Sequence, residues 1–289
     1  MNNYSYVCKV LTNKLKIMNV LSLFDGMSCG QIALDNLGFK VDNYFASEIK
    51  EDAIKVTQEN FPSTKQLGSV LNVKGSDLPS IDLLIGGSPC QNFSNAQWNG
   101  QRNGLDGEKS GLFFEFVRLL EETKPKYFLL ENVKMKKEYQ DIISNILGVQ
   151  PININSKVVS AQMRNRLYWT NIPQNLGSPE DTNCNLQDIL TSGYTTKKKA
   201  YCLLESESRP QKTNWKRFRR WRKKGFVNIV FETEDLNIFK NRILNQTELE
   251  RLQNIPDGYT KSLTRNQAAG LIGDGWTVNV IEHLFKGLL

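Results

Sequence analysis

Histidine is almost absent from this sequence, which limits the proton-transfer chemistry that the protein can perform. His283 is the single histidine among 289 residues, and it lies in the apolar segment VNVIEHLFKGLL, which favours a structural role. A hydrolase built on a Ser-His-Asp triad is therefore not indicated. The five cysteines include no Cys-x-x-Cys pair, so neither a disulfide framework nor a zinc site is predicted.

Long apolar runs are also missing. No window approaches 18 uninterrupted apolar residues, and the first residues lack the layout of a secretory signal. We therefore expect a cytoplasmic protein without a membrane or a metal partner.

The positive charge is concentrated in one segment. The net charge is +7, but residues 195–225 carry twelve Lys or Arg against two Glu, so the rest of the chain is slightly acidic. Aromatic residues interleave the densest part, WKRFRRWRKKGF, which is typical of a polyanion-binding surface. The alternative is a merely solvated face. We expect Trp215, Phe218 and Trp221 to anchor this segment to a small core, with its charges facing outward.

Apolar runs and helical patterns alternate through the first part of the chain. The expected strands are NVLSLF, VDNYFASE, IDLLIGGSP and KYFLLENV, and the expected helices are QIALDNLGF, DAIKVTQENF, GLFFEFVRLLEETK and EYQDIISNIL. INSKVVSA and RLYWTNI are expected to form a closing strand pair. This alternation predicts an α/β fold with a doubly wound, mostly parallel sheet.

The domain boundaries follow from where this alternation begins and stops. Residues 18–172 form the predicted catalytic, cofactor-binding domain, 173–241 a second small domain, and 242–289 a return to the first domain through further helices. Residues 1–17 are expected to be a dispensable extension, or the product of an upstream start codon.

The turn FDGMSCG follows the first expected strand and precedes the first expected helix, where open parallel sheets bind nucleotide-like ligands. The dinucleotide pattern G-x-G-x-x-G is not present. Glu48 ends the second expected strand, 23 residues after Asp25, where a carboxylate can accept ribose hydroxyls. A single nucleoside cofactor such as S-adenosylmethionine (AdoMet) fits this pattern.

Cys90 follows a strand that ends at the same predicted edge of the sheet. Gly86, Gly87 and Pro89 indicate a turn that presents the thiol, although a free cysteine can instead be a buried structural residue.

Glu131 ends the next strand, in LLENV, where it could donate a proton or serve as a hydrogen-bonded core residue. Arg164 and Arg166 lie two residues apart on an expected strand, so both should project to one face and suit an anion or a carbonyl group.

These segments resemble the DNA (cytosine-5)-methyltransferase family. FDGMSCG, ASE, GGSPCQNFS, LLENV, QMRNR and GWTVNVIEHLF occur in that family's order and spacing, over residues 18–170 and 242–289. The residues of these segments are most similar to those in the catalytic domains of the mammalian de novo enzymes. The length of the chain also suits a compact bacterial or phage member. The resemblance implies that 173–241 is a target-recognition domain for double-stranded DNA.

The resemblance also implies the chemistry. Cys90 would add to carbon 6 of cytosine, Glu131 would act at ring N3, Arg166 would contact the ring carbonyl, and Arg164 would support the thiolate. The target base must then be flipped out of the duplex, and the loop after Cys90 would close over it.

Two further sets of residues follow from the resemblance. Cofactor contacts are expected from Phe24, Asp25, Gly26, Met27, Ser28, Cys29, Glu48, Ile49, Ser69, Val70, Pro89, Asp274, Gly275 and Trp276. DNA contacts are expected from Gln97, Arg102, Trp215, Arg217, Arg219, Arg220 and Arg222. Ser69 departs from the family, which often has Asp there, and Asp274 stands where many bacterial members have Asn.

Two alternatives stay open at this point: a transfer RNA substrate, and a DNA-binding homologue that has lost catalysis. The expected setting is a bacterial or phage-infected cell, with association to the nucleoid through DNA. A monomer is compatible with the sequence, which does not specify the oligomeric state, the recognised DNA sequence or a restriction partner.

Overall fold

One mostly parallel sheet organises the part of the chain that the computed structural model describes, residues 17–88, 111–175, 177–224 and 227–289. Within these ranges, seven strands follow the order β3-β2-β1-β4-β5-β7-β6. They are β1 (Met18–Leu23), β2 (Val41–Ser47), β3 (Lys65–Gln66), β4 (Leu83–Gly87), β5 (Tyr127–Val133), β6 (Ile152–Asn155) and β7 (Asn165–Thr170). β1 to β5 pair in parallel, whereas β7 is antiparallel to β5 and β6. The predicted doubly wound α/β fold is confirmed.

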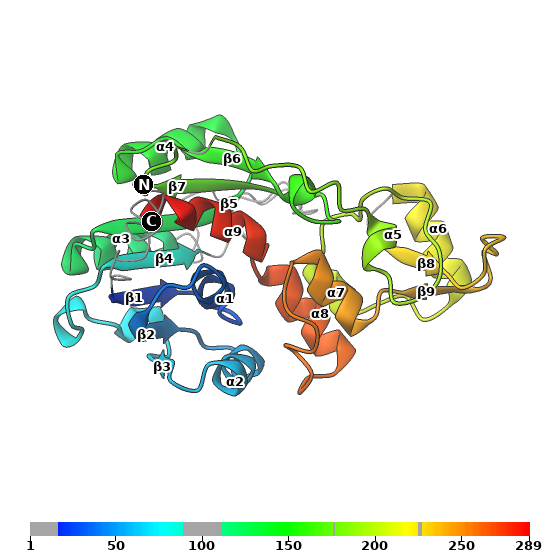
Figure 1. The fold of residues 1–289 in the computed structure, drawn as a ribbon, viewed down its shortest axis with the longest axis horizontal. Helices are drawn as coiled ribbons and strands as arrows, with labels where there is room; N and C mark the ends of the chain where they lie inside the picture. Colours follow the sequence, from blue (N-terminus) through cyan, green and yellow to red (C-terminus); the bar gives the residue numbers. More distant parts are fainter. Residues whose placement is uncertain (1–16, 89–110, 176, 225–226) are drawn as a thin grey trace, which may run out of the picture.

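Helices cover both faces of this sheet (Figure 1). The covering helices are α1 (Cys29–Asn36), α2 (Glu51–Asn60), α3 (Gly111–Thr123), α4 (Lys137–Leu147) and α9 (Val278–Phe285). Two more helices, α7 (Gln246–Leu252) and α8 (Arg265–Asp274), lie beside the sheet. One apolar cluster joins the sheet to α1, α8 and α9, and a second joins it to α3 and α4. The central strands are buried by both clusters, which is why they are almost continuously apolar.

The stretch after β6 differs from the expectation. INSKVVSA was predicted as a strand, but β6 ends at Asn155 and residues Ser156–Val158 form a 3-10 turn. Asn155 Oδ1 accepts a hydrogen bond from the backbone N–H of Lys157 at 3.1 Å. A local side-chain cap of this kind competes with strand pairing, and it overrides the β-branched residues that follow.

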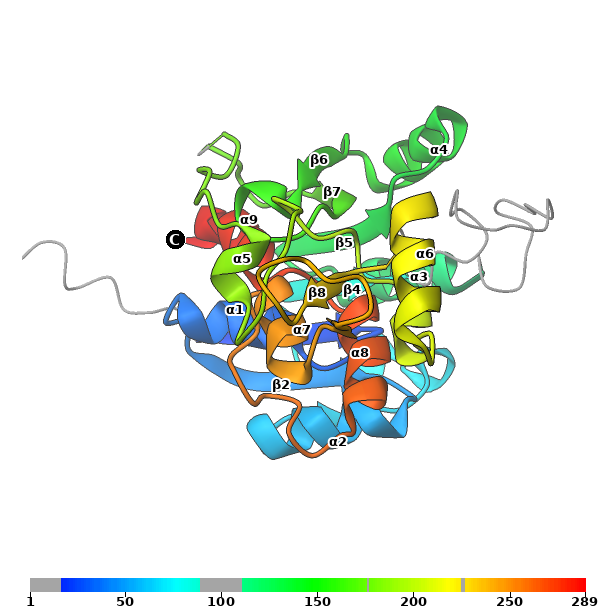
Figure 2. The ribbon, with the colours of Figure 1, turned by 90° about the vertical axis from the view of Figure 1, so that its right-hand side faces the viewer.

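A second, smaller unit contains α5 (Leu186–Ile189), α6 (Asn214–Lys224) and the antiparallel pair β8 (Ile229–Phe231) and β9 (Asn241–Ile243). Figure 1 shows this unit at one end of the molecule, with α7 and α8 between it and the large sheet. In Figure 2, α6 lies on the same side of the molecule as α3 and α4. The helix α6 is therefore on the same side of the molecule as the second apolar cluster.

Hydrogen bonds tie the smaller unit to the rest of the chain. Between α5 and α6, the backbone N–H of Leu203 donates to Gln162 Oε1 at 2.6 Å. On exit, both Nη atoms of Arg242 donate to the buried carboxylate of Glu248 at 2.7 Å. Elsewhere His283 Nε2 lies 2.9 Å from the carbonyl oxygen of Gly177, which gives the single histidine a structural contact. Among the described helices, none has the length and apolar character needed to cross a membrane.

Candidate active site

A cavity of about 460 Å³ lies at the carboxyl ends of β1, β2, β4 and β5. It brings together many of the residues singled out from the sequence: Phe24, Asp25, Gly26, Cys29, Glu48, Ile49, Ser69, Val70, Glu131, Arg164, Arg166, Asp274, Gly275 and Trp276. Met27 and Ser28 are fully buried beneath this lining. Pro89, Cys90, Gln97 and Arg102 lie outside the described residues.

The turn after β1 fixes the position of Glu48. The backbone N–H of Gly26 donates to Glu48 Oε2 at 2.8 Å, and Glu48 Oε1 accepts from the N–H groups of Ile49 and Lys50 at 2.7 and 2.9 Å. A carboxylate offers about four lone-pair directions, so Glu48 keeps capacity for a ligand. Because three backbone amides donate to it, the carboxylate has a fixed orientation at the cavity wall.

Asp25 is the acidic centre of the same turn. It accepts hydrogen bonds from the hydroxyl groups of Ser28 and Tyr44, the second at 2.8 Å. Burial raises the pKa of Asp25 to about 6, against the lowering effect of these bonds, and the charge of Glu48 raises it further. A cation placed in the cavity would favour the ionised form.

Asp25 should make the stability of the ligand-free protein depend on pH. Its pKa is raised on folding, so the stability that the protonated form provides is lost as pH rises from about 4 to about 6. Asn mimics a protonated carboxyl group and does not ionise. The free energy of unfolding of Asp25→Asn, relative to that of wild type, should therefore increase by about 1–3 kcal/mol from pH 4 to pH 7. Denaturant unfolding of both proteins at the two pH values measures this. A difference that does not change with pH would contradict the shift.

Glu131 lies at the end of β5 and is 8% exposed. Arg166 Nε lies 2.9 Å from Glu131 Oε1, and Trp276 Nε1 donates to Glu131 Oε2 at 3.2 Å. A Cβ on Gly87 would lie 2.9 Å from that indole nitrogen and 3.1 Å from Glu131 Oε2, so glycine is needed there. The carboxyl group is thereby oriented from two sides at the boundary of the cavity.

Arg164 has a different environment from the one expected. The strand β7 begins at Asn165, so Arg164 precedes it, and its side chain is 4% exposed. Its guanidinium donates to the carbonyl oxygens of Gly273 and Gly275 at 3.0 and 2.9 Å and contacts Cys202 Sγ at 3.5 Å. Arg164 and Arg166 border one cavity, but Arg164 holds the backbone on either side of Asp274.

Two residues that the sequence patterns did not single out support this wall. Gln253 Nε2 donates to the carbonyl oxygens of Ile272 and Gly275 at 3.1 and 3.3 Å, and its Oε1 accepts from Thr277 Oγ1 at 2.6 Å. The hydroxyl of Tyr259 donates to the carbonyl oxygen of Met27 at 2.7 Å. Gln253 is a fully buried polar residue at the end of a helix, and its sequence context RLQNIP gives only a weak signal for such a role.

The described cysteines do not offer a nucleophile in this cavity. Burial raises the pKa of the Cys29 thiol to about 12, which keeps it protonated near neutral pH. β4 leads to Ser88, whose Oγ accepts a hydrogen bond from Asn132 Nδ2 at 3.1 Å. Within the described ranges there is also no group of three or more His, Cys, Asp or Glu side chains that could hold a metal ion.

The two positions that depart from the family pattern lie at the cavity mouth. Ser69 caps a short turn, Val70–Asn72, and its Oγ accepts from the backbone N–H of Leu71 at 3.4 Å. Asp274 forms an exposed ion pair with Lys50 at 2.6 Å. This pair links the end of α8 to the start of α2 across the cavity rim.

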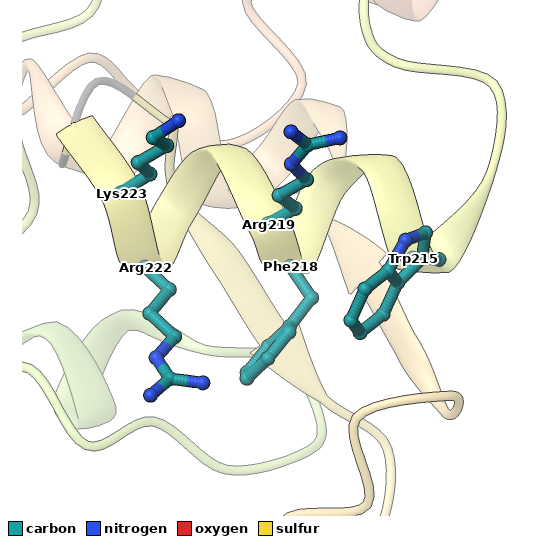
Figure 3. A pocket seen from close by; sticks show the side chains of 5 residues that line it. All are labelled: Trp215, Phe218, Arg219, Arg222 and Lys223. Atoms are coloured by element: carbon teal, nitrogen blue, oxygen red, sulfur yellow. The ribbon is translucent and has the colours of Figure 1, made fainter.

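The basic segment forms α6, and its residues divide between two roles. Arg219, Arg220 and Arg222 are exposed, whereas Arg217 donates to the carbonyl oxygens of Gln211, Lys212 and Asn241. Trp215, Phe218, Arg219, Arg222 and Lys223 line a hollow of about 360 Å³. Figure 3 shows these five side chains projecting from α6.

The aromatic anchors of α6 are Phe218 and Trp221, which pack on the small core of Val227, Ile229 and Phe231. Trp215 is 50% exposed, so the expectation that it anchors the segment is wrong. It lies at the start of the helix, beyond the reach of that core.

Comparisons with known proteins find similar sequences and a similar fold. Residues 18–148 match the family model of the C-5 cytosine-specific DNA methylases. The orphan methyltransferase M.SPRI of Bacillus phage SPR is 32% identical over 61% of this chain, which spans only 43% of that relative's length. The type II methyltransferase M1.ScrFI of Lactococcus lactis subsp. cremoris is 28% identical over 88% of this chain and 74% of its own. The Entamoeba histolytica methyltransferase EhMeth shares the fold, with a TM-score of 0.74, 18% identity, and coverage of 95% of this chain and 99% of its own.

Proposed function

We propose that the chain is a C-5 cytosine-specific DNA methylase and that it transfers a methyl group from AdoMet to carbon 5 of cytosine in double-stranded DNA. The observation that carries the proposal is the position of Glu131, paired with Arg166, at the wall of the same cavity that contains Glu48 and the turn after β1. A cofactor and a target base bound there would be neighbours.

The cavity fits AdoMet by its chemistry. Two carboxylates, Asp25 and Glu48, face a cofactor that carries a net positive charge and ribose hydroxyls. Ile49 and Leu71 are exposed apolar side chains at the rim and suit a flat ring. The backbone from Phe24 to Cys29 would hold the cofactor's amino acid end, with Ser69, Val70, Pro89, Asp274, Gly275 and Trp276 completing the site.

The reaction requires a nucleophile because cytosine carbon 5 is too weakly nucleophilic by itself. The Cys90 thiolate adds to carbon 6 while the carboxyl group of Glu131 gives a proton to ring N3, which leaves an enamine that is nucleophilic at carbon 5. When bound, AdoMet supplies an electrophilic methyl group. A base then removes the carbon 5 proton, the sulfur–carbon bond breaks so that Cys90 leaves as a thiolate, and the ring N3 proton returns to Glu131.

The two arginines have separate tasks in this scheme. Arg166 orients Glu131 and would contact the ring carbonyl of the flipped cytosine, where negative charge develops. Arg164 is a positioning residue, because its guanidinium donates hydrogen bonds to the carbonyl oxygens of Gly273 and Gly275. Its support for the thiolate side would therefore be indirect.

Bisulfite sequencing of DNA from cells that express the protein tests the proposal and identifies the target site. We expect protected cytosines at one recurring sequence, and none in cells that carry the empty vector. Methylation of purified duplex DNA and of transfer RNA by the same preparation separates the substrates. Transfer of the methyl group to RNA alone, or to neither substrate, would refute the proposal.

Trp276 should affect catalysis through its N–H group. Trp276→Phe keeps an aromatic ring beside the cofactor but removes the hydrogen bond to Glu131. Because the indole N–H orients the carboxyl group that gives the proton, and an ordinary hydrogen bond contributes about 0.5–1.5 kcal/mol, we expect kcat to fall by about twofold to tenfold. AdoMet affinity, measured by calorimetry, should change by less than about threefold. Unchanged kcat would show that the indole N–H does not orient the acid.

A further inference from the structure

Two aromatic side chains are exposed together at the outer end of the smaller unit. Trp215 is 50% exposed and Phe239 is 64% exposed. Their rings are stacked, with centroids 6.3 Å apart and an interplanar angle of 23°. Isolated exposed apolar residues are ordinary, but a paired aromatic surface of this kind more often marks a binding site.

Hydrogen bonds hold this pair in place. Asn214 Nδ2 donates to the carbonyl oxygen of Phe239 at 2.5 Å, and Asn241 Nδ2 donates to those of Asn214 and Ile238 at 3.1 and 2.6 Å. The start of α6 is thereby tied to the segment before β9. The two rings are presented by a fixed backbone, which lowers the entropy cost of binding.

The surroundings of the pair are strongly basic. Trp215 lines a hollow with Phe218, Arg219, Arg222 and Lys223, and these cations lie along the same helix (Figure 3). A second copy of the chain would bring like charges together at this surface. A polyanion is the complementary partner, and duplex DNA combines phosphates with apolar sugar and base edges.

We propose that the Trp215–Phe239 pair packs against sugars and base edges of duplex DNA, next to phosphate contacts from Arg219, Arg222 and Lys223. This rests on the proposed function, since it assigns α6 to the DNA substrate. The pair contributes affinity that does not depend on salt, because apolar burial releases no condensed counterions. The cations contribute the salt-dependent part.

The double variant Trp215→Ala/Phe239→Ala separates these two contributions. We expect duplex DNA affinity to fall by about tenfold to a hundredfold at every salt concentration, because the burial of two large apolar rings against the DNA is lost. The slope of log affinity against log salt should stay within about half a unit of wild type, since no phosphate contact is lost. Fluorescence anisotropy titrations from low to moderate salt measure both quantities.

Two controls keep this test decisive. Trp215→Tyr/Phe239→Tyr retains both ring faces and should recover most of the affinity even if the alanine variant folds poorly. Trp221→Phe changes a tryptophan that packs on the small core and should leave DNA affinity near wild type.

Three results would overturn the inference. One is wild-type affinity in the alanine variant, and another is a reduced salt slope, which would assign phosphate contacts to the pair. The third is a wild-type dimer in sedimentation that the alanine variant converts to a monomer. Failure of the proposed function is distinct, because wild-type protein would then neither bind nor methylate duplex DNA.

Discussion

Replacing Cys90 by serine should abolish methyl transfer, with a loss of at least about 10³-fold, because the proposed reaction passes through a covalent sulfur–carbon bond. A serine hydroxyl is scarcely ionised near neutral pH, whereas an ordinary cysteine has a pKa of about 8.5. AdoMet binding should persist, since its proposed contacts come mainly from other segments. Transfer of a labelled methyl group to duplex DNA measures the first effect, and calorimetry the second.

Trapping provides the matched control for this variant. DNA that contains 5-fluorocytosine should give a denaturation-resistant adduct with wild-type protein, because fluorine cannot leave as a proton does. Cys184→Ser, at a half-buried cysteine outside the cavity, should still form the adduct. Turnover of Cys90→Ser near the wild-type rate, or an active enzyme that forms no adduct, would refute the covalent mechanism.

Converting Arg219, Arg220 and Arg222 to Gln should weaken DNA binding in a salt-dependent manner. Each phosphate contact that is lost reduces the slope of log affinity against log salt by about 0.9 on duplex DNA, so the triple variant should lose roughly two to three units. All three side chains are exposed on α6. AdoMet affinity should not change, because the cofactor cavity lies in the other unit.

A second triple variant controls for the change in net charge. Lys40, Lys124 and Lys126 are exposed at the amino edge of the large sheet, and their conversion to Gln removes the same charge far from α6. We expect a much smaller change of slope there. Equal slopes in wild type and the arginine variant would mean that α6 is only a solvated face.

The cavity could largely be placed from the sequence because its residues follow strands. Asp25, Glu48 and Glu131 each come directly after or at the end of an apolar run, and parallel strands deliver such residues to one edge. The contact between Trp276 and Glu131 could not be predicted, since 145 residues separate them. Only the folded return of α8 and α9 brings them together.

Two features could not be predicted from the sequence, and the cause is of the same kind. The exposure of Trp215 depends on where the small core ends, which the pattern of α6 does not reveal because charged residues surround every aromatic. The partners of Arg164 are backbone carbonyl oxygens, which carry no residue identity and leave no trace in the sequence. Periodicity predicts which face is apolar, not which distant groups a buried polar side chain will meet.

The fixed connections of the smaller unit have an evolutionary consequence. The segment between α5 and α6 is held by the bonds of Gln162 and of Ala200, and the exit after β9 by the pair Arg242 and Glu248. Recombination with breakpoints outside these contacts would transfer the unit together with the residues that hold it in place. If the smaller unit recognises the DNA sequence as proposed, one recombination event could give a lineage a new recognition sequence while the residues of the candidate active site stay unchanged.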